Sequence, residues 1–508
     1  MDGSADLLPI IDTQSRMKRV SPISASHGSV VVATAEIPAA ALSPRVIKPT
    51  SVTRAGILVI VAVVAGSLYA NFSYLLNDRA HFRYFPPFVR GLNRNNNDHL
   101  AAEYYSIAGA LVAGRGFADP FREQTGPTAW MPPILAWLLA GLRWVTNDNT
   151  QIVIAVLVVL QDLTLIATGL LILALARQST GEVGVAAVLF AAALCYYFRL
   201  CFQFTHDCWI VLFALDLLVA GMVWLRPFES SRRKAVLWGI GGGVFALVSP
   251  VIGFTWGVLA VTTGWRQGRR LRFTIALAMS IVTIAPWVVR NYLTLGRLIP
   301  IKSNLAFELY QSQCVAPDGI LNAQVFRTHP YNVDAEERGQ YRQLGEMGYV
   351  DRKWELFRGA VQAHPADFAE RVANRFFAAT LEYVPYHVRE QSQRPWTYWL
   401  SQAVYPLPFL SLLVLLFTTP WRPLTTCQWI VIGTYASYLL PYVVVSYYDR
   451  YKYPMVLAEI MMIVWAAGRL RSGWLRVTRR VDAAESPLKP GLALAPTSAG
   501  SLVNVALS

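Results

Sequence analysis

The chain has 508 residues, of which 54% are hydrophobic and only 15% carry a formal charge. Soluble domains carry about 25% charged residues, so this composition excludes an ordinary soluble protein and indicates an integral membrane protein. The net charge of +14 does not indicate nucleic-acid binding, because Lys and Arg lie mainly in short tracts beside apolar runs.

The two ends of the chain differ from the apolar middle. Residues 1–54 are rich in Ala, Ser and Pro and predict a disordered cytoplasmic tail, and residues 471–508 predict a second one. The first apolar run begins at Ala55, later than in a cleavable signal peptide. Both ends carry basic tracts, and such tracts beside spans are retained in the cytoplasm.

The apolar runs predict an all-α, polytopic membrane helix bundle of roughly ten to twelve spans, since each crossing needs about 20 helical residues. The segment 236–263 is too long for a single span and is interrupted at Pro250, so it is either one kinked helix or a short hairpin. The clearest spans are 55–75, 129–146, 152–176, 183–203, 207–225, 271–289, 398–418, 428–446 and 453–469.

The basic tracts at 226–234 and 266–272 also indicate the cytoplasmic side. If both are cytoplasmic, the segment between them is a hairpin. Counting spans from the first helix nevertheless places 226–234 on the outer side, and the sequence leaves this conflict open.

Two hydrophilic segments, 76–128 and 290–395, are expected on the outer side. The second is predicted to be mostly helical, because its apolar residues recur at steps of three and four, at Leu344, Met347, Val350, Trp354, Phe357 and Val361. Asp334 and Glu337 predict a capping box at the start of this helix, and His364–Pro365 predicts its end.

The first outer segment carries motifs of a known superfamily. It reads NNNDHLAAEYYSIAGALVAGRGFADPF and leads into TGPTAWMPPILAWLLAGL. The early acidic residue, the YYxxA helix, the GxGF turn and the GPTAxxPP entry resemble the GT-C superfamily of membrane glycosyltransferases. The closest likeness is to bacterial members of glycosyltransferase family 39, which are related to protein O-mannosyltransferases and lipid A aminoarabinose transferases. Residues 285–310 and the DRYKYPM motif at 449–455 continue this resemblance.

The resemblance implies an order of domains and an activity. Residues 55–289 would be the GT-C-like membrane module with the outer loop 76–128, residues 290–395 an extracytoplasmic helical loop, and residues 396–470 the C-terminal transmembrane helices. The activity would be transfer of a sugar, with inversion, from a polyprenyl-phosphate donor to an extracytoplasmic lipid, glycan or protein. The protein would lie in the inner (plasma) membrane, among its lipids.

Asp98 matches by position the carboxylate that acts on the acceptor in that family. A carboxylate can take the proton of an acceptor hydroxyl as the hydroxyl attacks the anomeric carbon. The alternative for Asp98 is a cap on the helix that follows.

Glu103 and Asp207 are the candidates for an acceptor site or a second acidic site, because His99 stands where the family often has a second acid. His99 and Glu103 are four residues apart and share a helical face, but two ligands fall short of a metal site. The sequence therefore assigns no cofactor, with a divalent metal as the alternative that some relatives suggest. Asp207 belongs to a polar cluster with Arg199, Thr205 and His206.

Cations are expected near the outer membrane surface, because the departing lipid phosphate gains negative charge. The alternative is interfacial anchoring, which accounts for most Lys and Arg at span ends. The candidates for binding the donor phosphate are Arg290, Arg297, Lys302, Arg450 and Lys452.

Two other functions fit a polytopic membrane protein. A secondary transporter commonly has discontinuous helices, with which the interrupted segment 236–263 is compatible. A noncatalytic lipid-binding protein on the same scaffold is the other alternative. The sequence names neither the sugar nor the acceptor.

Overall fold

The computed structural model describes residues 49–77, 88, 93–97, 99–122, 124–265, 268–332, 336–387 and 393–485. Residues 1–48 of the first predicted tail and residues 486–508 of the second therefore lie outside the described residues. Every regular element of the described part is a helix, which confirms the all-α prediction. These residues belong to one compact unit that begins at Ile47.

Seven helical segments of the described chain are long and apolar enough to cross a membrane, which supports a membrane protein. Two further apolar helices, α3 and α5, are shorter, so the expected ten to twelve spans are not confirmed. The seven segments lie on α1 (Pro49–Asn77), α4 (Thr150–Ser179), α6 (Cys208–Ala220), α9 (Arg270–Leu295), α14 (Pro395–Val404) with α15 (Leu407–Phe417), α16 (Thr426–Val444) and α17 (Val456–Glu485). Because α17 continues to Glu485, the chain is helical beyond residue 471, where the sequence indicated a tail.

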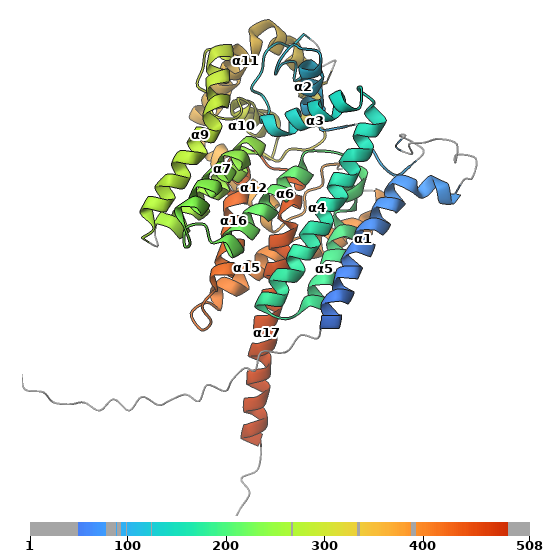
Figure 1. Cartoon of the computed structure of the whole chain (residues 1–508), viewed down its shortest axis with the longest axis vertical. Helices are drawn as coiled ribbons and strands as arrows, with labels where there is room; N and C mark the ends of the chain where they lie inside the picture. Colours follow the sequence, from blue (N-terminus) through green and yellow to red (C-terminus); the bar gives the residue numbers. More distant parts are fainter. Residues whose placement is uncertain are drawn as a thin grey trace, which may run out of the picture. The chain divides into compact units, whose positions relative to one another are not determined.

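The predicted span 129–146 corresponds to α3 (Pro133–Val145), whose two ends lie at the same end of the bundle (Figure 1). Near its start, the Ala129 carbonyl accepts the Ser303 N–H at 2.9 Å. Near its end, Arg143 donates to the Tyr105 carbonyl at 3.0 Å. A 13-residue helix is about 20 Å long, too short for a hydrocarbon core of about 30 Å. Accordingly, α3 lies along α2 (Ala102–Val112), and the expected span at 129–146 is not confirmed.

If α3 is not counted as a span, four predicted spans precede residues 226–234, and this even number agrees with a cytoplasmic position of the tract. This tract lies beside the start of α9, because Arg269 pairs with Glu229 at 3.0 Å and Arg272 donates to the Phe228 carbonyl at 2.6 Å. We call this the basic end of the bundle. The loop before α5 (Val183–Tyr196) also lies at this end, where Glu182 is 3.5 Å from Arg471 of α17.

The segment 236–263 is a pair of helices, α7 (Arg232–Val248) and α8 (Pro250–Ala260). Ser249 between them has an extended backbone with φ −158° and ψ 130°. A Cβ on Gly253 would lie 2.6 Å from the Cβ of Ala246, so α8 folds back closely on α7. This arrangement supports the hairpin over the single kinked helix. On its other side α7 packs against α9, where a Cβ on Gly239 would lie 2.2 Å from the carbonyl oxygen of Ala276.

The predicted outer insertion contains α10 (Leu305–Tyr310), a 3₁₀ turn (Val325–Thr328), α11 (Glu336–Ala363) and α12 (Pro365–Thr380). The predicted break at His364–Pro365 is confirmed. The predicted apolar stripe is wrong at Leu344 and Trp354, which are 50% and 41% exposed. At Leu344 the reason is a kink at Gly345, where φ is 68° and ψ is 171°, so Leu344 is out of helical register with the residues that follow. The buried positions of α11 are Tyr341, Glu346, Tyr349, Lys353 and Phe357, and Asp334 of the predicted capping box lies outside the described residues.

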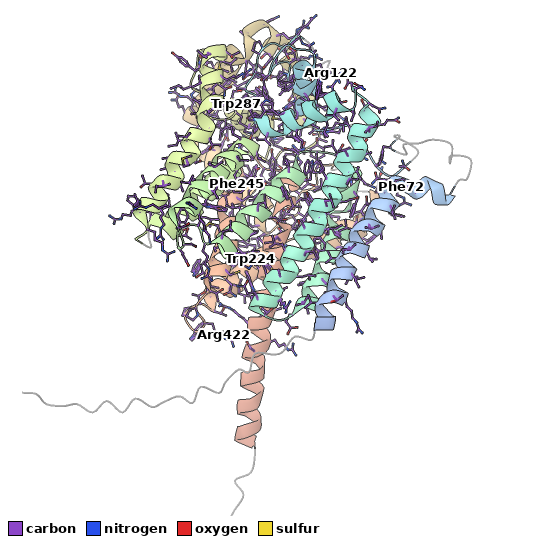
Figure 2. The ribbon with its side chains drawn as sticks, in the orientation of Figure 1. Phe72, Arg122, Trp224, Phe245, Trp287 and Arg422 are labelled. Carbon is purple, nitrogen blue, oxygen red and sulfur yellow. The ribbon has the colours of Figure 1, made fainter. Side chains whose placement is uncertain are left out.

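Aromatic packing joins α9 to α3 and to the first outer segment. Trp287 on α9, labelled in Figure 2, has its ring 4.8 Å from that of Phe117 and 5.7 Å from that of Trp137. Its indole N–H donates to the Ile301 carbonyl at 2.7 Å. These contacts fix α3 and the entry to the insertion on the end of α9.

The two outer segments meet at the buried carboxylate of Glu346. This group accepts hydrogen bonds from the Ala129 N–H at 2.8 Å, from the hydroxyls of Ser303 and Tyr341 at 2.7 Å, and from the Thr128 hydroxyl. Burial raises the pKa of Glu346, and the four donors oppose this effect because they stabilise the ionised form. Glu346 therefore joins the segment that carries α2 to the insertion.

Candidate functional site

A cavity of about 860 Å³ lies among segments that are distant in the sequence. Its lining comes from residues 96–104, the end of α5, the start of α6, residues 323–332, residues 383–387, α14 and residues 448–450. This volume is typical of a site for a small molecule or a lipid headgroup.

Backbone hydrogen bonds bring the first outer segment to the start of α6. The Asn96 N–H donates to the Gln203 carbonyl at 2.5 Å, and the Ala101 N–H donates to the Thr205 carbonyl at 3.1 Å. The Thr205 hydroxyl in turn donates to the Asn97 carbonyl at 3.2 Å. Residues 99–103 are thereby held next to residues 206 and 207.

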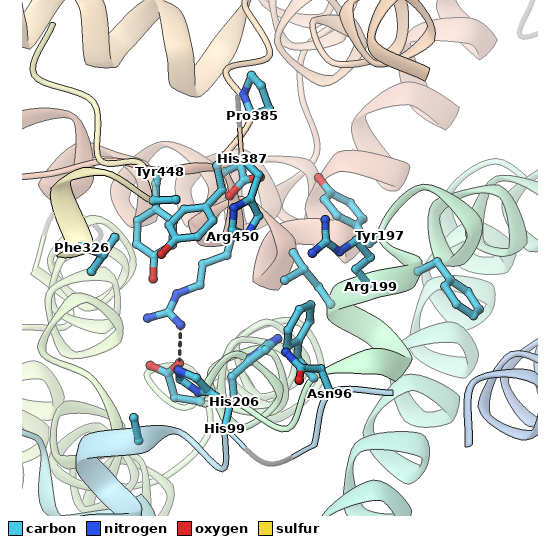
Figure 3. A pocket seen from close by; sticks show the side chains of 18 of the residues that line it. Asn96, His99, Tyr197, Arg199, His206, Phe326, Pro385, His387, Tyr448 and Arg450 are labelled. Atoms are coloured by element: carbon cyan, nitrogen blue, oxygen red, sulfur yellow. Dashed lines mark ion pairs between the residues drawn. The ribbon is translucent and has the colours of Figure 1, made fainter. Parts of the chain in front are cut away.

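An ion pair lies in the cavity between Arg450 and Asp207, whose Nη1 and Oδ1 atoms are 3.8 Å apart. Figure 3 shows the guanidinium of Arg450 in the middle of the cavity, directed toward His206 and the adjacent carboxylate. Burial alone would raise the pKa of Asp207, but the charge of Arg450, together with His206, a backbone hydrogen bond and His99, outweighs it and the pKa is lowered. Asp207 is therefore a carboxylate at neutral pH.

His206 beside this pair is neutral. Burial, reinforced by the positive charge of Arg450, lowers the pKa of His206 to about 3. Its Nδ1 atom accepts the Cys208 N–H at 2.9 Å, so the proton is assigned to Nε2. The Nε2 atom of His206 and the Nε atom of Arg450 are both buried and have no hydrogen-bond partner among the described residues. Two buried N–H groups beside the cavity therefore have no acceptor among the described residues.

Arg450 is held in place by aromatic rings. Its guanidinium carbon lies 4.8 Å from the ring centre of Tyr448 and 5.9 Å from that of Tyr451, within cation–π range. Three more arginines line the cavity, namely Arg199, Arg327 and Arg394. The arrangement can bind an anion at the guanidinium groups while the carboxylates of Glu103, Asp207 and Asp449 accept hydrogen bonds from hydroxyls.

Asp98, the predicted catalytic residue, lies outside the described residues. Its neighbours Asn96 and His99 line the cavity. The side chain of buried Asn97 donates to Asn71 of α1 at 3.2 Å, which holds this part of the chain against the bundle.

Of the five cations expected at the donor phosphate, only Arg450 lines the cavity. Arg290 donates to the carbonyls of Thr128 at 2.5 Å and Phe117 at 2.6 Å. Lys452 is 1% exposed and donates to the Tyr405 carbonyl at 2.8 Å. Both cations therefore hold backbone carbonyl groups, and neither lines the cavity.

The other two expected cations pair with carboxylates away from the cavity lining. Arg297 makes two hydrogen bonds of 2.6 Å to Asp351 on the exposed side of α11. Lys302 donates to Glu308 at 2.6 Å. These contacts account for both charges without a ligand.

One group of described residues has metal-ligand atoms close together, namely His206, Asp207 and Cys208, whose atoms lie within 4.8 Å of one another. The group fits a metal poorly, because Nδ1 of His206 accepts a backbone hydrogen bond and Asp207 faces the Arg450 guanidinium. A divalent cation would be repelled by that guanidinium. The weak sequence candidates His99 and Glu103 both line the cavity.

The sequence reasoning named Glu103, Asp207 and Arg450 at this site but missed His329, Tyr386, His387 and Tyr448. His329 lies in the segment FRTHPYN, which has no helical or strand periodicity. The only signal there is the mixture of aromatic and basic residue types.

The chain matches no family model, no curated protein and no solved structure in the comparisons with known proteins. The likeness to membrane glycosyltransferases therefore rests on the sequence motifs alone.

Proposed function

We propose that this protein is a membrane-bound glycosyltransferase that moves a sugar, with inversion, from a polyprenyl-phosphate donor to an extracytoplasmic acceptor. The observation that carries the proposal is the cavity-lining group of Arg450, Asp207 and Glu103. A sugar phosphate needs cations for its phosphate and hydrogen-bond acceptors for its hydroxyls, and this cavity offers both.

In this proposal Arg450 binds the donor phosphate. Its guanidinium is oriented by Tyr448 and Tyr451 and keeps an unpartnered Nε–H. A guanidinium fixed in advance stabilises charge that develops on the departing phosphate oxygen, at no further cost of reorganisation. Asp98, whose chain neighbours line the cavity, is the proposed base that takes the acceptor proton.

The distribution of basic tracts supports an extracytoplasmic cavity. Lys and Arg near span ends are retained in the cytoplasm, so we assign the basic end to the cytoplasm of a plasma (inner) membrane protein. The cavity-lining starts of α6 and α14 are at the opposite ends of their helices from the basic end. If α5 extended by the π-helical turn Arg199–Gln203, α7, and α8 extended by the π-helical turn Val261–Trp265 also cross, the bundle has roughly ten crossings and both ends of the described chain are cytoplasmic.

The cavity also adjoins surface suited to lipid. Thr397, Tyr398 and Ser401 of α14 line it, while Trp396 and Trp399 on the same helix are each 69% exposed. Exposed tryptophans are typical of the membrane interface. A donor with a polyprenyl chain could therefore keep its chain in the bilayer while its head enters the cavity.

The proposed binding is tested by protection of Cys195, an exposed cysteine that lines the cavity. Purified protein is treated with N-ethylmaleimide, and modification of each cysteine peptide is followed by mass spectrometry. Polyprenyl-phosphate sugars are expected to slow modification of Cys195 as their concentration rises, because their heads cover the thiol.

Cys314 provides the internal control, because it is exposed but does not line the cavity. Its modification rate is expected to stay constant, and polyprenol without phosphate should protect neither residue. An unchanged rate at Cys195 with every polyprenyl-phosphate sugar tested would count against the proposed binding.

A further inference from the structure

His329 is a neutral histidine held by aromatic rings in the wall of the cavity. Its ring centre lies 5.3 Å from that of Phe307, 5.7 Å from that of Phe121 and 6.0 Å from that of Phe326. Burial lowers the pKa of His329 to about 4, so the imidazole is uncharged at neutral pH. Three rings leave this side chain little freedom to rotate.

The hydrogen bonding of His329 assigns its proton. Its Nδ1 atom accepts the Tyr331 N–H at 3.2 Å. A neutral imidazole has one donor and one acceptor nitrogen, so Nε2 carries the proton. The Nε2 atom lies 3.5 Å from Oε1 of Glu103. This distance is longer than that of a strong hydrogen bond, and such pairs often shorten when a substrate binds.

Glu103 is the partner that this N–H donor can orient. It lies in the first turn of α2, lines the cavity, and has a side chain that is 17% exposed. A carboxylate has two oxygens that accept several hydrogen bonds, so the contact with His329 leaves acceptor positions for a ligand.

We infer that Glu103 and His329 form a hydroxyl-binding pair for the sugar of the donor, in which Glu103 accepts the hydroxyl proton in a hydrogen bond and His329 is a positioning residue. This inference rests on the proposed function. Arg450 and Glu103 line one cavity and attract each other electrostatically. A sugar whose phosphate is bound by Arg450 would therefore lie close to Glu103. Carboxylates are suitable acceptors for sugar hydroxyls because they form charge-assisted hydrogen bonds.

Several charged groups act on Glu103 from the surrounding segments. Burial raises the pKa of Glu103, while His99 and Arg450 act to lower it and Asp207 acts to raise it. Tyr331, which follows His329, also interacts electrostatically with this carboxylate. If the N–H of His329 donates to Glu103 as inferred, its loss removes a group that stabilises the carboxylate and should raise the pKa of Glu103 further.

Two substitutions distinguish two roles of His329, namely positioning the Glu103 carboxylate and supporting the local backbone through the Tyr331 N–H. In His329→Asn the short amide can accept the Tyr331 N–H but does not reach Glu103. In His329→Gln the longer amide can place an N–H near the position of Nε2. A merely structural histidine would be replaced better by Asn, whereas the positioning role requires Gln.

The readout is labelling of Glu103 by a hydrophobic carbodiimide, which reacts with protonated carboxyl groups, followed by peptide mass spectrometry across a pH series. His329→Asn should move the labelling midpoint up by about one pH unit, and His329→Gln should stay close to the unsubstituted protein. Equal midpoints in all three proteins, equal shifts in both variants, or a shift in His329→Gln alone would overturn the positioning role. Melting temperatures of the purified variants identify any that fail to fold.

A second comparison tests the ligand. A polyprenyl-phosphate sugar should protect Glu103 from the carbodiimide, and polyprenyl phosphate without sugar should not. If both lipids protect Cys195 but leave Glu103 labelled equally, the hydroxyl-binding pair is refuted while donor binding stands. If neither protects Cys195, the proposed function itself has failed.

Discussion

Replacing Arg450 by Gln is expected to lower transfer from a polyprenyl-phosphate donor by about 100-fold or more, the usual effect of removing one fixed donor from developing charge. Arg450 is the only one of the five predicted phosphate-binding cations that lines the cavity. Glutamine keeps hydrogen-bonding capacity but loses the charge. The measurement is the rate of polyprenyl-phosphate release, together with donor affinity from Cys195 protection.

The substitution also leaves Asp207 without its cationic neighbour, so misfolding must be separated from lost binding. The side chains of Asp207 and Arg450 are 25% and 27% exposed, so removing one partner should cost less than the roughly 3–5 kcal/mol of a fully buried pair. The double variant Asp207→Asn with Arg450→Gln removes the unpaired charge and should recover thermal stability without recovering transfer. Recovered transfer in the double variant would mean that Arg450 serves only to neutralise Asp207.

Replacing Glu346 by Gln is expected to destabilise the outer region by about 3 kcal/mol, because a buried group that accepts several hydrogen bonds would lose its charge and gain a donor. The four donors of Glu346 come from Thr128, Ala129, Ser303 and Tyr341. An amide has one oxygen for these donors, and its NH₂ group would face others. The measurement is the midpoint of thermal unfolding of the purified protein.

Glu355 on the same helix provides the matched control. Its side chain is 68% exposed and forms an exposed ion pair with Arg352 at 3.5 Å. Glu355→Gln should change stability by less than about 0.5 kcal/mol. Equal unfolding midpoints for the Glu346 and Glu355 variants would show that the buried carboxylate does not join the two outer segments.

The sequence predicts the membrane helices best where the length of an apolar run is enough to identify a helix. The runs that become α1, α4 and α9 are long, and the structure has helices there. The predicted span at 129–146 is not confirmed, because Pro133 starts the helix late and apolarity does not distinguish a short helix lying on α2 from a span. On α11 the predicted stripe is wrong at Leu344, because the positive φ of Gly345 puts this residue out of register with the helix that follows.

The residues of the candidate site were likewise predictable only in part. Glu103, Asp207 and Arg450 could be singled out because each is a charged residue close to an apolar run, where charge is costly. His329 could not be found, because its meaning depends on contacts with Glu103 and Phe121 from a distant part of the chain. Arg290 was singled out by the same rule as Arg450, but its guanidinium binds backbone carbonyls instead. Hydrophobic periodicity does not predict which charged side chains form contacts within the folded protein.

The most direct test of donor-dependent glycosyl transfer incubates purified protein with a panel of polyprenyl-phosphate sugars and cell-envelope acceptors. The unsubstituted protein should release polyprenyl phosphate and transfer the sugar from at least one donor. The Asp98→Asn variant should be expressed, and that donor should still protect its Cys195 from modification. The variant should nevertheless fail to transfer the sugar. Protection of Cys195 without release from any donor would indicate a noncatalytic lipid-binding protein, and sugar uptake into sealed vesicles without a lipid-linked donor would indicate a transporter. Either result, or full transfer by Asp98→Asn, would contradict a glycosyltransferase that uses Asp98 as its base.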